Sequence, residues 1–196
     1  MTVYQALMQN QAIMRVMDDF ETPRLRVRHW HANFDDGPRL QALHHDLAGM
    51  LTPDVLHHLP PPLQITDAPD AIAKWITDRD TESDVFTIRA QTSETLLGLL
   101  ILAEFQQPDG PHDIHDIHLG FMFAQSAWGK GYASELIAGL VQWAREQPRP
   151  IHLLGGVAKT NPASARVLQK AGFTRVAERS DDETDMFGML SSSATK

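Results

Sequence analysis

The sequence has 196 residues, 42% hydrophobic and 21% charged, which is typical of a single globular domain of ordinary size. It contains no cysteine, which excludes disulfides, thiolate zinc sites and cysteine nucleophiles, and no apolar run near the roughly 20 residues of a membrane helix, so we expect a cytoplasmic protein without membrane partners. The formal net charge of -8 argues against a nucleic-acid partner, because positive charge against phosphate supplies most non-specific affinity.

An arm, a strand and two helices are predicted in the first 80 residues. Apolar residues at loosely helical spacing predict an N-terminal helical arm or extension over 1–20. The segment RLRVRHW alternates apolar and charged residues, which predicts a half-buried strand over 24–30. Leucines three or four residues apart predict a helix over 37–51, and DAPDAIAKWITDRD predicts another over 67–80 with Pro69 in its first turn.

Strands dominate the remainder of the predicted elements. Two strands joined by the polar turn QTSE predict a hairpin over 84–105, and single strands are predicted over 114–123 and 151–158. The segments FTRVAE and TDMFGML predict two final strands, followed by a disordered tail over 191–196.

Two helices are predicted between these strands. An apolar stripe predicts the first over 131–146, and Asn161 caps the start of the second. Gly172 is placed to end that helix in the left-handed conformation, with Phe173 contacting Leu168. The resulting order, β-α-α-β-β-β-α-β-α-β-β, predicts a layered α/β (α+β) domain with a mixed sheet.

The stretch AWGKGYASE places Gly129 and Gly131 where a predicted strand turns into a predicted helix. The first turn of a helix exposes unpaired N–H groups at the positive end of its dipole, so one hypothesis is a phosphate cradle. Two nucleotide motifs do not fit: Ser134 replaces the third glycine of the dinucleotide fingerprint, and Gly131 stands where the Walker motif needs Ser or Thr. A tight turn without a ligand is the alternative, because a lone Gly-x-Gly is a weak signal.

Two longer motifs resemble a known family. The segment HLGFMFAQSAWGKGYASELIAGLVQWA, followed about thirty residues later by NPASARVLQKAGF, is similar to the GNAT superfamily of N-acetyltransferases. ETPRLRVRHW resembles the opening strand of its RimJ/RimL-like branch. The resemblance covers about residues 21–190 and implies a GNAT domain: a mixed, mostly antiparallel, six- to seven-stranded sheet flanked by helices, whose strands four and five (114–123 and 151–158) splay apart.

The resemblance implies acetyl transfer from acetyl-CoA to a primary amine by direct attack in a ternary complex, without a metal ion. The pantetheine arm of the coenzyme would lie between the splayed strands, and N–H groups of the turn that follows would hold the diphosphate, with Gly129 and Gly131 at the family's small positions. Ser126 stands where many members have Gln or Arg, so one side-chain contact to phosphate is missing. Lys130 either adds charge or is an ordinary surface lysine, and Asn161 either contacts the pantetheine or only caps its helix. The expected coenzyme-binding residues are Phe121, Met122, Phe123, Ser126, Trp128, Gly129, Lys130, Gly131, Tyr132, Ala133, Ser134, Asn161 and Ser164.

The chemistry requires a proton acceptor and an oxyanion donor. An amine attacks only when neutral and is mostly protonated at pH 7, so a base or water must take a proton. The attacked carbonyl oxygen needs a fixed N–H donor. In the family a bulged stretch of the fourth strand offers such an amide, which indicates Phe121, Met122 or Phe123 here.

The catalytic side chains are less well defined by the motifs. His118 stands where the family often has a glutamate, so it is a candidate base, unless it is only a half-buried residue that forms hydrogen bonds. Glu104 is the competing base. The tyrosine that many members use as an acid is replaced by Leu168, which leaves Ser164 or water to protonate the thiolate.

The acceptor is expected to be a small-molecule or peptide amine. Trp30 and His31 follow the first strand where the family's acceptor cleft begins, so they contact the amine unless they belong to the core.

His112, His115 and His118 recur every third residue, which suits neither a strand face nor a helical zinc pair, and no metal is expected. A homodimer paired through the N-terminal arm stays open. The alternative function is a CoA-binding regulatory or interaction module with little or no turnover.

Overall fold

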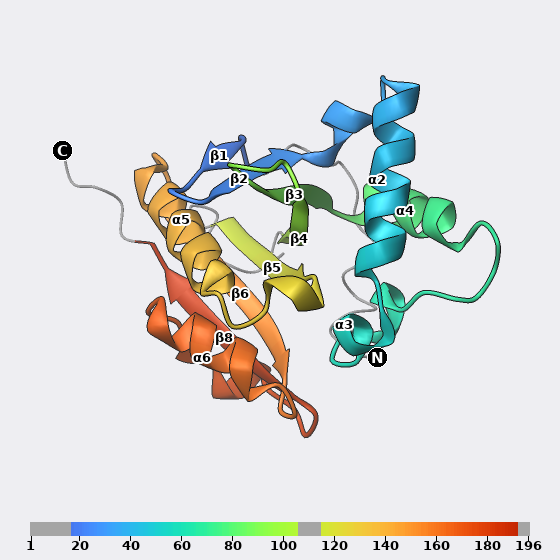
Figure 1. The fold of residues 1–196 in the computed structure, drawn as a ribbon. Helices are drawn as coiled ribbons and strands as arrows, with labels where there is room; N and C mark the ends of the chain where they lie inside the picture. Colours follow the sequence, from blue (N-terminus) through green and yellow to red (C-terminus); the bar gives the residue numbers. More distant parts are fainter. Residues whose placement is uncertain (1–16, 106–114, 192–196) are drawn as a thin grey trace.

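An eight-stranded sheet forms the centre of the molecule (Figure 1). The structure, a computed structural model, describes residues 17–105 and 115–191. The strand order is β1-β2-β3-β4-β5-β6-β8-β7, and all described neighbours are antiparallel except β5 and β6, which are parallel. The strands are β1 (Phe20–Glu21), β2 (Leu25–His29), β3 (Asp84–Ala90), β4 (Leu96–Phe105), β5 (His115–Phe123), β6 (Ile151–Ala158), β7 (Thr174–Arg175) and β8 (Thr184–Leu190). The predicted mixed sheet is confirmed, and it exceeds six or seven strands because the two-residue strands β1 and β7 extend its edges.

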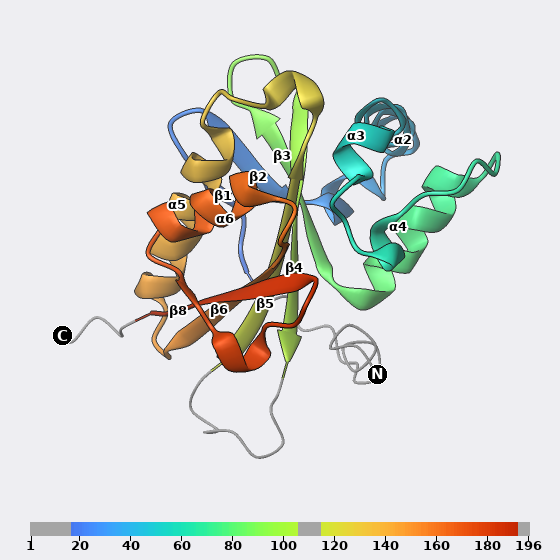
Figure 2. The ribbon, with the colours of Figure 1, turned by 90° about the horizontal axis from the view of Figure 1, so that it is seen from below.

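Helices cover both faces of the sheet, as the edge-on view in Figure 2 shows. On one face lie α2 (Gly37–Met50), α3 (Pro53–Leu56) and α4 (Ala71–Glu82), and on the other lie α5 (Tyr132–Glu146) and α6 (Pro162–Lys170). Short 3-10 turns connect several elements: η1 (Trp30–Asn33), η2 (Pro61–Leu63), η3 (Gln125–Ala127) and η4 (Ala177–Arg179). Among the described helices, none combines the length and apolar character that crossing a bilayer requires.

Each face of the sheet has its own hydrophobic core. Leu136 and Leu140 of α5 pack with Leu153 of β6 in the first core. Leu47 of α2 and Trp75 of α4 pack in the second core with the opposite face of the strands. The sheet therefore separates two layers that bury different sets of side chains.

The predicted end of α6 is confirmed in detail. Gly172 has a φ of 93°, and its N–H donates to the carbonyl of Gln169 at 3.1 Å. The N–H of Phe173 donates to the carbonyl of Leu168 at 3.1 Å. This pair of bonds is the Schellman ending, in which a glycine without a Cβ takes the left-handed position.

Two predictions about element boundaries need correction, and a third falls mostly on residues that the structure does not describe. The helix expected over 67–80 begins at Ala71, so Pro69 precedes it instead of standing in its first turn. The strand expected in FTRVAE pairs only at Thr174–Arg175, because the chain then turns into η4. The N-terminal arm falls mainly on residues 1–16 and the tail on 192–196, outside the described residues, while Phe20 already begins β1.

Candidate functional site

The parallel strands β5 and β6 part halfway along their length. They pair with each other from His115–Ile151 to His118–Leu154 and no further within the described residues. Beyond that point β5 still pairs with β4, and β6 still pairs with β8 up to Ala158. Both chains stay extended but diverge, so the splayed strands expected over 114–123 and 151–158 are confirmed.

Backbone groups of β5 face the gap between the two strands. The N–H of Ala124 donates to the carbonyl of Leu97 at 2.8 Å, which fixes the antiparallel register at the end of β5. Because polar groups on a strand point alternately to its two neighbours, Met122 directs its N–H and C=O toward β4. Phe121 and Phe123 direct theirs toward the gap. Of the three expected oxyanion donors, Met122 therefore directs its N–H to the sheet, and Phe121 and Phe123 direct theirs to the gap.

Backbone groups of β6 face the same gap from the other side. The N–H of Ser191 donates to the carbonyl of Ile151 at 2.8 Å, so Ile151 and every second residue after it face β8. The intervening residues Gly156 and Ala158 face β5. Two of these carbonyls already accept a hydrogen bond, that of Phe123 from Nε1 of Trp128 at 2.8 Å and that of Ala158 from the N–H of Asn161 at 2.7 Å. The other gap-facing N–H and C=O groups would be partners for an extended ligand with amide groups.

The turn after β5 leads into α5 through two glycines in the left-handed region. Gly129 has a φ of 72° and Gly131 a φ of 80°. Gly131 is the N-cap of α5 and has no side chain with which to cap the N–H groups of the first turn. These N–H groups, which belong to Tyr132, Ala133 and Ser134, are the donors that a helix start offers to an anion.

Exposed side chains surround this turn. Ser126 and Lys130 are exposed, and Trp128 is 48% exposed although it is a large hydrophobic residue. The indole Nε1 of Trp128 donates to the carbonyl of Phe123 at 2.8 Å. Because Phe123 is a gap-facing residue, this bond fixes the Trp128 ring at the open end of the gap.

His118 lies where β5 and β6 begin to part. It pairs with Leu154 at the last parallel position, and its neighbours on the same face include Asp116, His152 and Arg179. Asp116 accepts a hydrogen bond from Arg179 at 3.2 Å and lies 3.1 Å from Nδ1 of His152. Burial, followed by the charge of Arg179, lowers the pKa of His118 to about 4, against the smaller opposing effect of Asp116. The ring is therefore neutral at pH 7 and is a weak base.

Glu104 and His118 lie on opposite faces of the sheet. Glu104 pairs across strands with Ile117, and directly opposed residues share a face. Ile117 belongs to the core beneath α5 and α6, whereas His118, the next residue, points to the other face. The Glu104 carboxylate lies 2.6 Å from Nδ1 of His115. The structure does not bring the two candidate bases together.

Helix α6 begins directly after the diverging end of β6. The Oδ1 atom of Asn161 accepts the N–H of Ser164 at 3.1 Å, so Asn161 caps the helix. Ser164 is half-buried in the first turn. Leu168, in the position where many family members have a tyrosine, is fully buried over Gly155.

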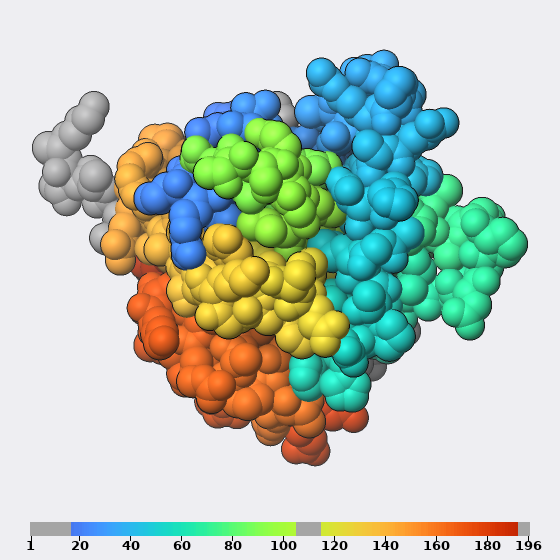
Figure 3. All heavy atoms as spheres, in the orientation of Figure 1, coloured from blue at the N-terminus to red at the C-terminus, as the bar shows by residue number. Residues whose placement is uncertain are grey.

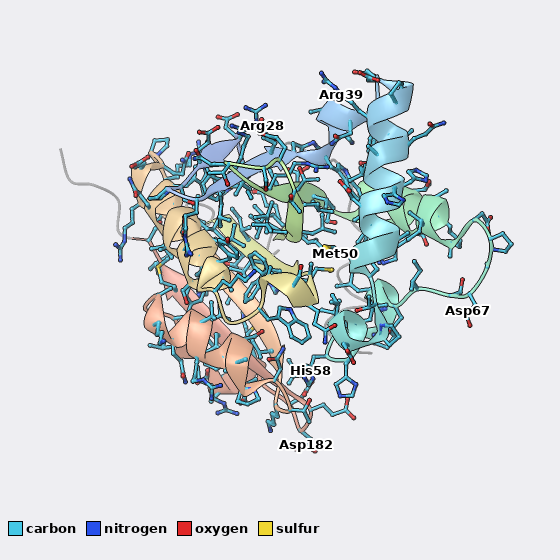
Figure 4. All side chains as sticks on the ribbon, viewed as in Figure 1. Arg28, Arg39, Met50, His58, Asp67 and Asp182 are labelled. Carbon is cyan, nitrogen blue, oxygen red and sulfur yellow. The ribbon has the colours of Figure 1, made fainter. Side chains whose placement is uncertain are left out.

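Trp30 is a core residue, which is one of the two alternatives that the sequence left open for it. Its side chain is fully buried, and its Nε1 donates to Asp80 at 2.9 Å. The exposed His31 lies 2.5 Å from the same carboxylate. Figure 4 marks the two ends of α2 by Arg39 and Met50: η1 adjoins the Arg39 end, whereas the end of β5 adjoins Met50.

The segment around α3 spans the open end of the gap. On α3, the Asp54 carboxylate accepts from Nε2 of Gln125, in the turn after β5, at 3.1 Å. Just beyond α3, Nδ1 of His58 lies 3.3 Å from Oγ1 of Thr160, in the turn after β6. Figure 3 shows the teal atoms of this segment against the yellow and orange atoms of the two turns. No local pattern predicts these contacts, because they join residues 71 and 102 positions apart.

No group of three or more His, Asp or Glu side chains in 17–105 and 115–191 is arranged to hold a metal ion. His112 of the histidine series lies outside the described residues.

Comparison with known proteins identifies the domain type. The family model described as "Acetyltransferase (GNAT) domain" matches residues 24–174. None of the curated proteins compared with the chain matches it.

Solved structures share the fold at low sequence identity. A GNAT-family acetyltransferase from Bacillus anthracis is 16% identical with a TM-score of 0.60, over 88% of this chain and 96% of that one. Spermidine N-acetyltransferase from Vibrio cholerae, solved with CoA and spermine, is 16% identical with a TM-score of 0.58, over 85% and 95% of the two chains. RimL, a ribosomal L7/L12 α-N-protein acetyltransferase solved with CoA, is 15% identical with a TM-score of 0.58, over 89% and 98%.

Proposed function

Because the chain belongs to the GNAT acetyltransferase family, we propose that it transfers an acetyl group from acetyl-CoA to a primary amine by direct attack in a ternary complex. The observation that carries the proposal is the divergence of β5 and β6 beyond His118–Leu154, with the uncapped start of α5 at its open end. A split sheet offers amide partners to an extended arm, and a helix start offers donors to a diphosphate.

Acetyl-CoA fits the residues that surround this gap. The first-turn N–H groups of α5 would bind the diphosphate, with Lys130 adding a positive charge, while the turn at Ser126 would contribute through its backbone. Phe121 and Phe123 on one wall and Gly156 and Ala158 on the other would bind the pantetheine amides. Trp128, Asn161 and Ser164 would border the arm at its two ends. When bound, acetyl-CoA supplies the activated acetyl group.

The chain's own groups would then orient the amine and stabilise charge. The N–H of Phe121, which faces the gap, would donate to the carbonyl oxygen on which negative charge develops. The neutral ring of His118 would accept a hydrogen bond from the attacking amine, and the proton of the amine would pass on to water. A weak base can relay a proton in this way without remaining protonated. Ser164 or water would protonate the departing thiolate, because the buried Leu168 has no hydroxyl. Glu104 lies on the opposite face of the sheet and has no part in this scheme.

The RimJ/RimL-like branch is our proposal for the position of the chain within the family. The motifs ETPRLRVRHW and NPASARVLQKAGF and the fold shared with RimL support it. The acceptor would be a protein N-terminus or a small-molecule amine. The neighbouring spermidine N-acetyltransferase and RimL represent these two acceptor classes.

The test is calorimetric binding of acetyl-CoA, followed by a thiol-release screen against amines and peptides. The parent is expected to bind, and Gly131→Val is expected to lose binding because a β-branched residue is strained at a φ of 80°. Absence of binding by the parent, or undiminished binding by the variant, would contradict the proposal. The lowered pKa of His118 favours one second candidate, a CoA-binding module with little or no turnover. That candidate predicts binding without release of thiol from any acceptor.

A further inference from the structure

Arg24, just before β2, is joined to the start of α5 across 111 residues of sequence. Its Nε donates to Oε2 of Glu135 at 2.6 Å, and its Nη1 donates to the carbonyl of Lys130 at 2.9 Å. The guanidinium carbon lies 4.6 Å from the centre of the Tyr132 ring. One side chain therefore holds three residues of the turn and first helical turn that the coenzyme would occupy.

The Glu135 carboxylate accepts three hydrogen bonds from the segment before β2. Its Oε1 accepts from Oγ1 of Thr22 at 2.6 Å and from the backbone N–H of Arg24 at 2.8 Å. Burial acts to raise the pKa of Glu135, but the hydrogen bonds from Thr22 and Arg24 outweigh it, so the pKa lies below its usual range. The carboxylate is thus ionised, and Arg24 is its counter-charge.

Close packing of two side chains against the backbone of α5 supports this contact. A Cβ atom on Gly139 of α5 would lie 2.7 Å from the Phe20 ring and 3.0 Å from the methyl group of Thr22. The absence of that atom lets the segment from Phe20 to Arg24 lie directly on α5. In Figure 3 the blue atoms of this segment adjoin the yellow and orange atoms at the start of the helix.

Part of the Arg24 guanidinium remains turned toward the helix start. Its Nη2 lies 3.5 Å from the position that a Cβ atom on Gly131 would take, and the side chain is 48% exposed. An arginine carries five N–H donors in a planar fork, and Glu135 and Lys130 take one each in the bonds described. The remaining donors lie beside the N-cap of α5.

We propose, on the basis of the proposed function, that Arg24 is a positioning residue for the diphosphate site. It holds the turn from Lys130 to Glu135 in the shape that leaves the first N–H groups of α5 accessible. It also neutralises the Glu135 carboxylate, which would otherwise repel the phosphates from within the first turns of the same helix. An acidic side chain close to a phosphate site is compatible with binding only when it is paired in this way.

The test uses four variants and two acetyl donors. Arg24→Met removes the clamp, Arg24→Lys keeps the charge without the planar fork, Glu135→Gln removes the repelling charge, and the double variant Arg24→Met/Glu135→Gln removes both. Arg28→Met is the matched control, since Arg28 lies on β2 four residues after Arg24 and is exposed (Figure 4). Its ion pair with Glu21 is long, with 3.9 Å between Nη2 and a carboxylate oxygen. The donors are acetyl-CoA and the acetyl thioester of N-acetylcysteamine, which lacks the diphosphate.

Arg24→Met is expected to raise the Kd for CoA about tenfold or more, as the loss of charged hydrogen bonds predicts. Arg24→Lys is expected to be intermediate, and the double variant to recover about threefold relative to Arg24→Met. Arg28→Met is expected to match the parent. With the short thioester, Arg24→Met and the parent are expected to react at the same rate.

Three results would overturn the inference: CoA affinity of Arg24→Met within about twofold of the parent, a double variant that binds no better than Arg24→Met, or equal losses with both donors. The last result would make Arg24 a support of the fold alone, and thermal unfolding of each variant would show it independently. Failure of the parent to bind CoA would instead contradict the proposed function, so the two failures are distinguishable.

Discussion

Leu168 of α6 lies directly over Gly155 of β6, with its Cδ1 3.1 Å from the position that a Cβ atom on Gly155 would occupy. Gly155 is buried and Leu168 is fully buried, so neither has free space to move into. The close contact between this helix and this strand depends on the missing side chain.

Gly155→Ala is therefore expected to destabilise the protein by about 1–3 kcal/mol through overpacking. Chemical denaturation measures the free energy of unfolding. Gly49→Ala is the control, because a Cβ atom there meets nothing within 4 Å and alanine is the better helix former. A variant at Gly155 as stable as the parent would show that α6 shifts without cost.

Stability is expected to fall in mild acid because of His118. Its pKa is about 4 in the folded protein and 6.5 in the unfolded chain, so between these values the unfolded chain binds the proton and the folded protein does not. The stability that depends on a neutral His118 is fully present above pH 6.5 and is lost as the pH falls toward 4. It amounts to about 3 kcal/mol, since each pKa unit is worth about 1.4 kcal/mol.

Unfolding curves of the parent and His118→Gln between pH 7 and 4 would measure this contribution. The variant is expected to lose less stability than the parent by that amount, because glutamine does not titrate. Parallel pH profiles for the two proteins would contradict the prediction.

His118→Gln also tests the proposed proton path. We expect turnover to fall about tenfold or more, within the range typical of an acid–base group, while the Kd for acetyl-CoA stays unchanged. For the parent, turnover is expected to show no inflection near pH 6.5 from this residue, because the folded pKa is about 4. Unchanged turnover in the variant would assign deprotonation of the amine to water alone.

The α3 segment is expected to influence the acceptor and not the coenzyme. Asp54→Ala removes the bond to Gln125 on one side of the open end of the gap and is expected to raise the KM of the acceptor severalfold. Asp67→Ala is the control, since Asp67 is exposed on a distant loop (Figure 4). Equal acceptor KM values for the two variants would show that α3 does not border the acceptor's path.

Trp30→Phe tests the assignment of Trp30 to the core. The ring keeps most of its packing but loses the bond to Asp80, so we expect about 1–2 kcal/mol of destabilisation and an unchanged acceptor KM. A raised KM at unchanged stability would restore Trp30 as an acceptor contact.

Local signals in the sequence predicted the parts of the site that depend on local geometry. The glycines at 129 and 131 have positive φ values, and Asn161 and Gly172 begin and end their helix as the residue types indicate. These features follow from a few neighbouring residues, so a single sequence contains the information.

Features that depend on register or on distant partners could not be predicted in this way. The sequence does not show that Glu104 and His118 lie on opposite faces of the sheet, because this depends on the pairing of β4 with β5. The sequence left Trp30 open between acceptor contact and core, because the bond from its indole goes to Asp80, 50 residues later. The Arg24–Glu135 pair joins segments that no local pattern relates.

The two cores on opposite sides of the sheet make the molecule modular. A substitution beneath α2–α4 alters the side chains packed in that core. The side chains that support α5 and α6 belong to the other core and keep their own neighbours. Changes in the packing beneath α2–α4 can thus accumulate without rebuilding the layer of α5 and α6.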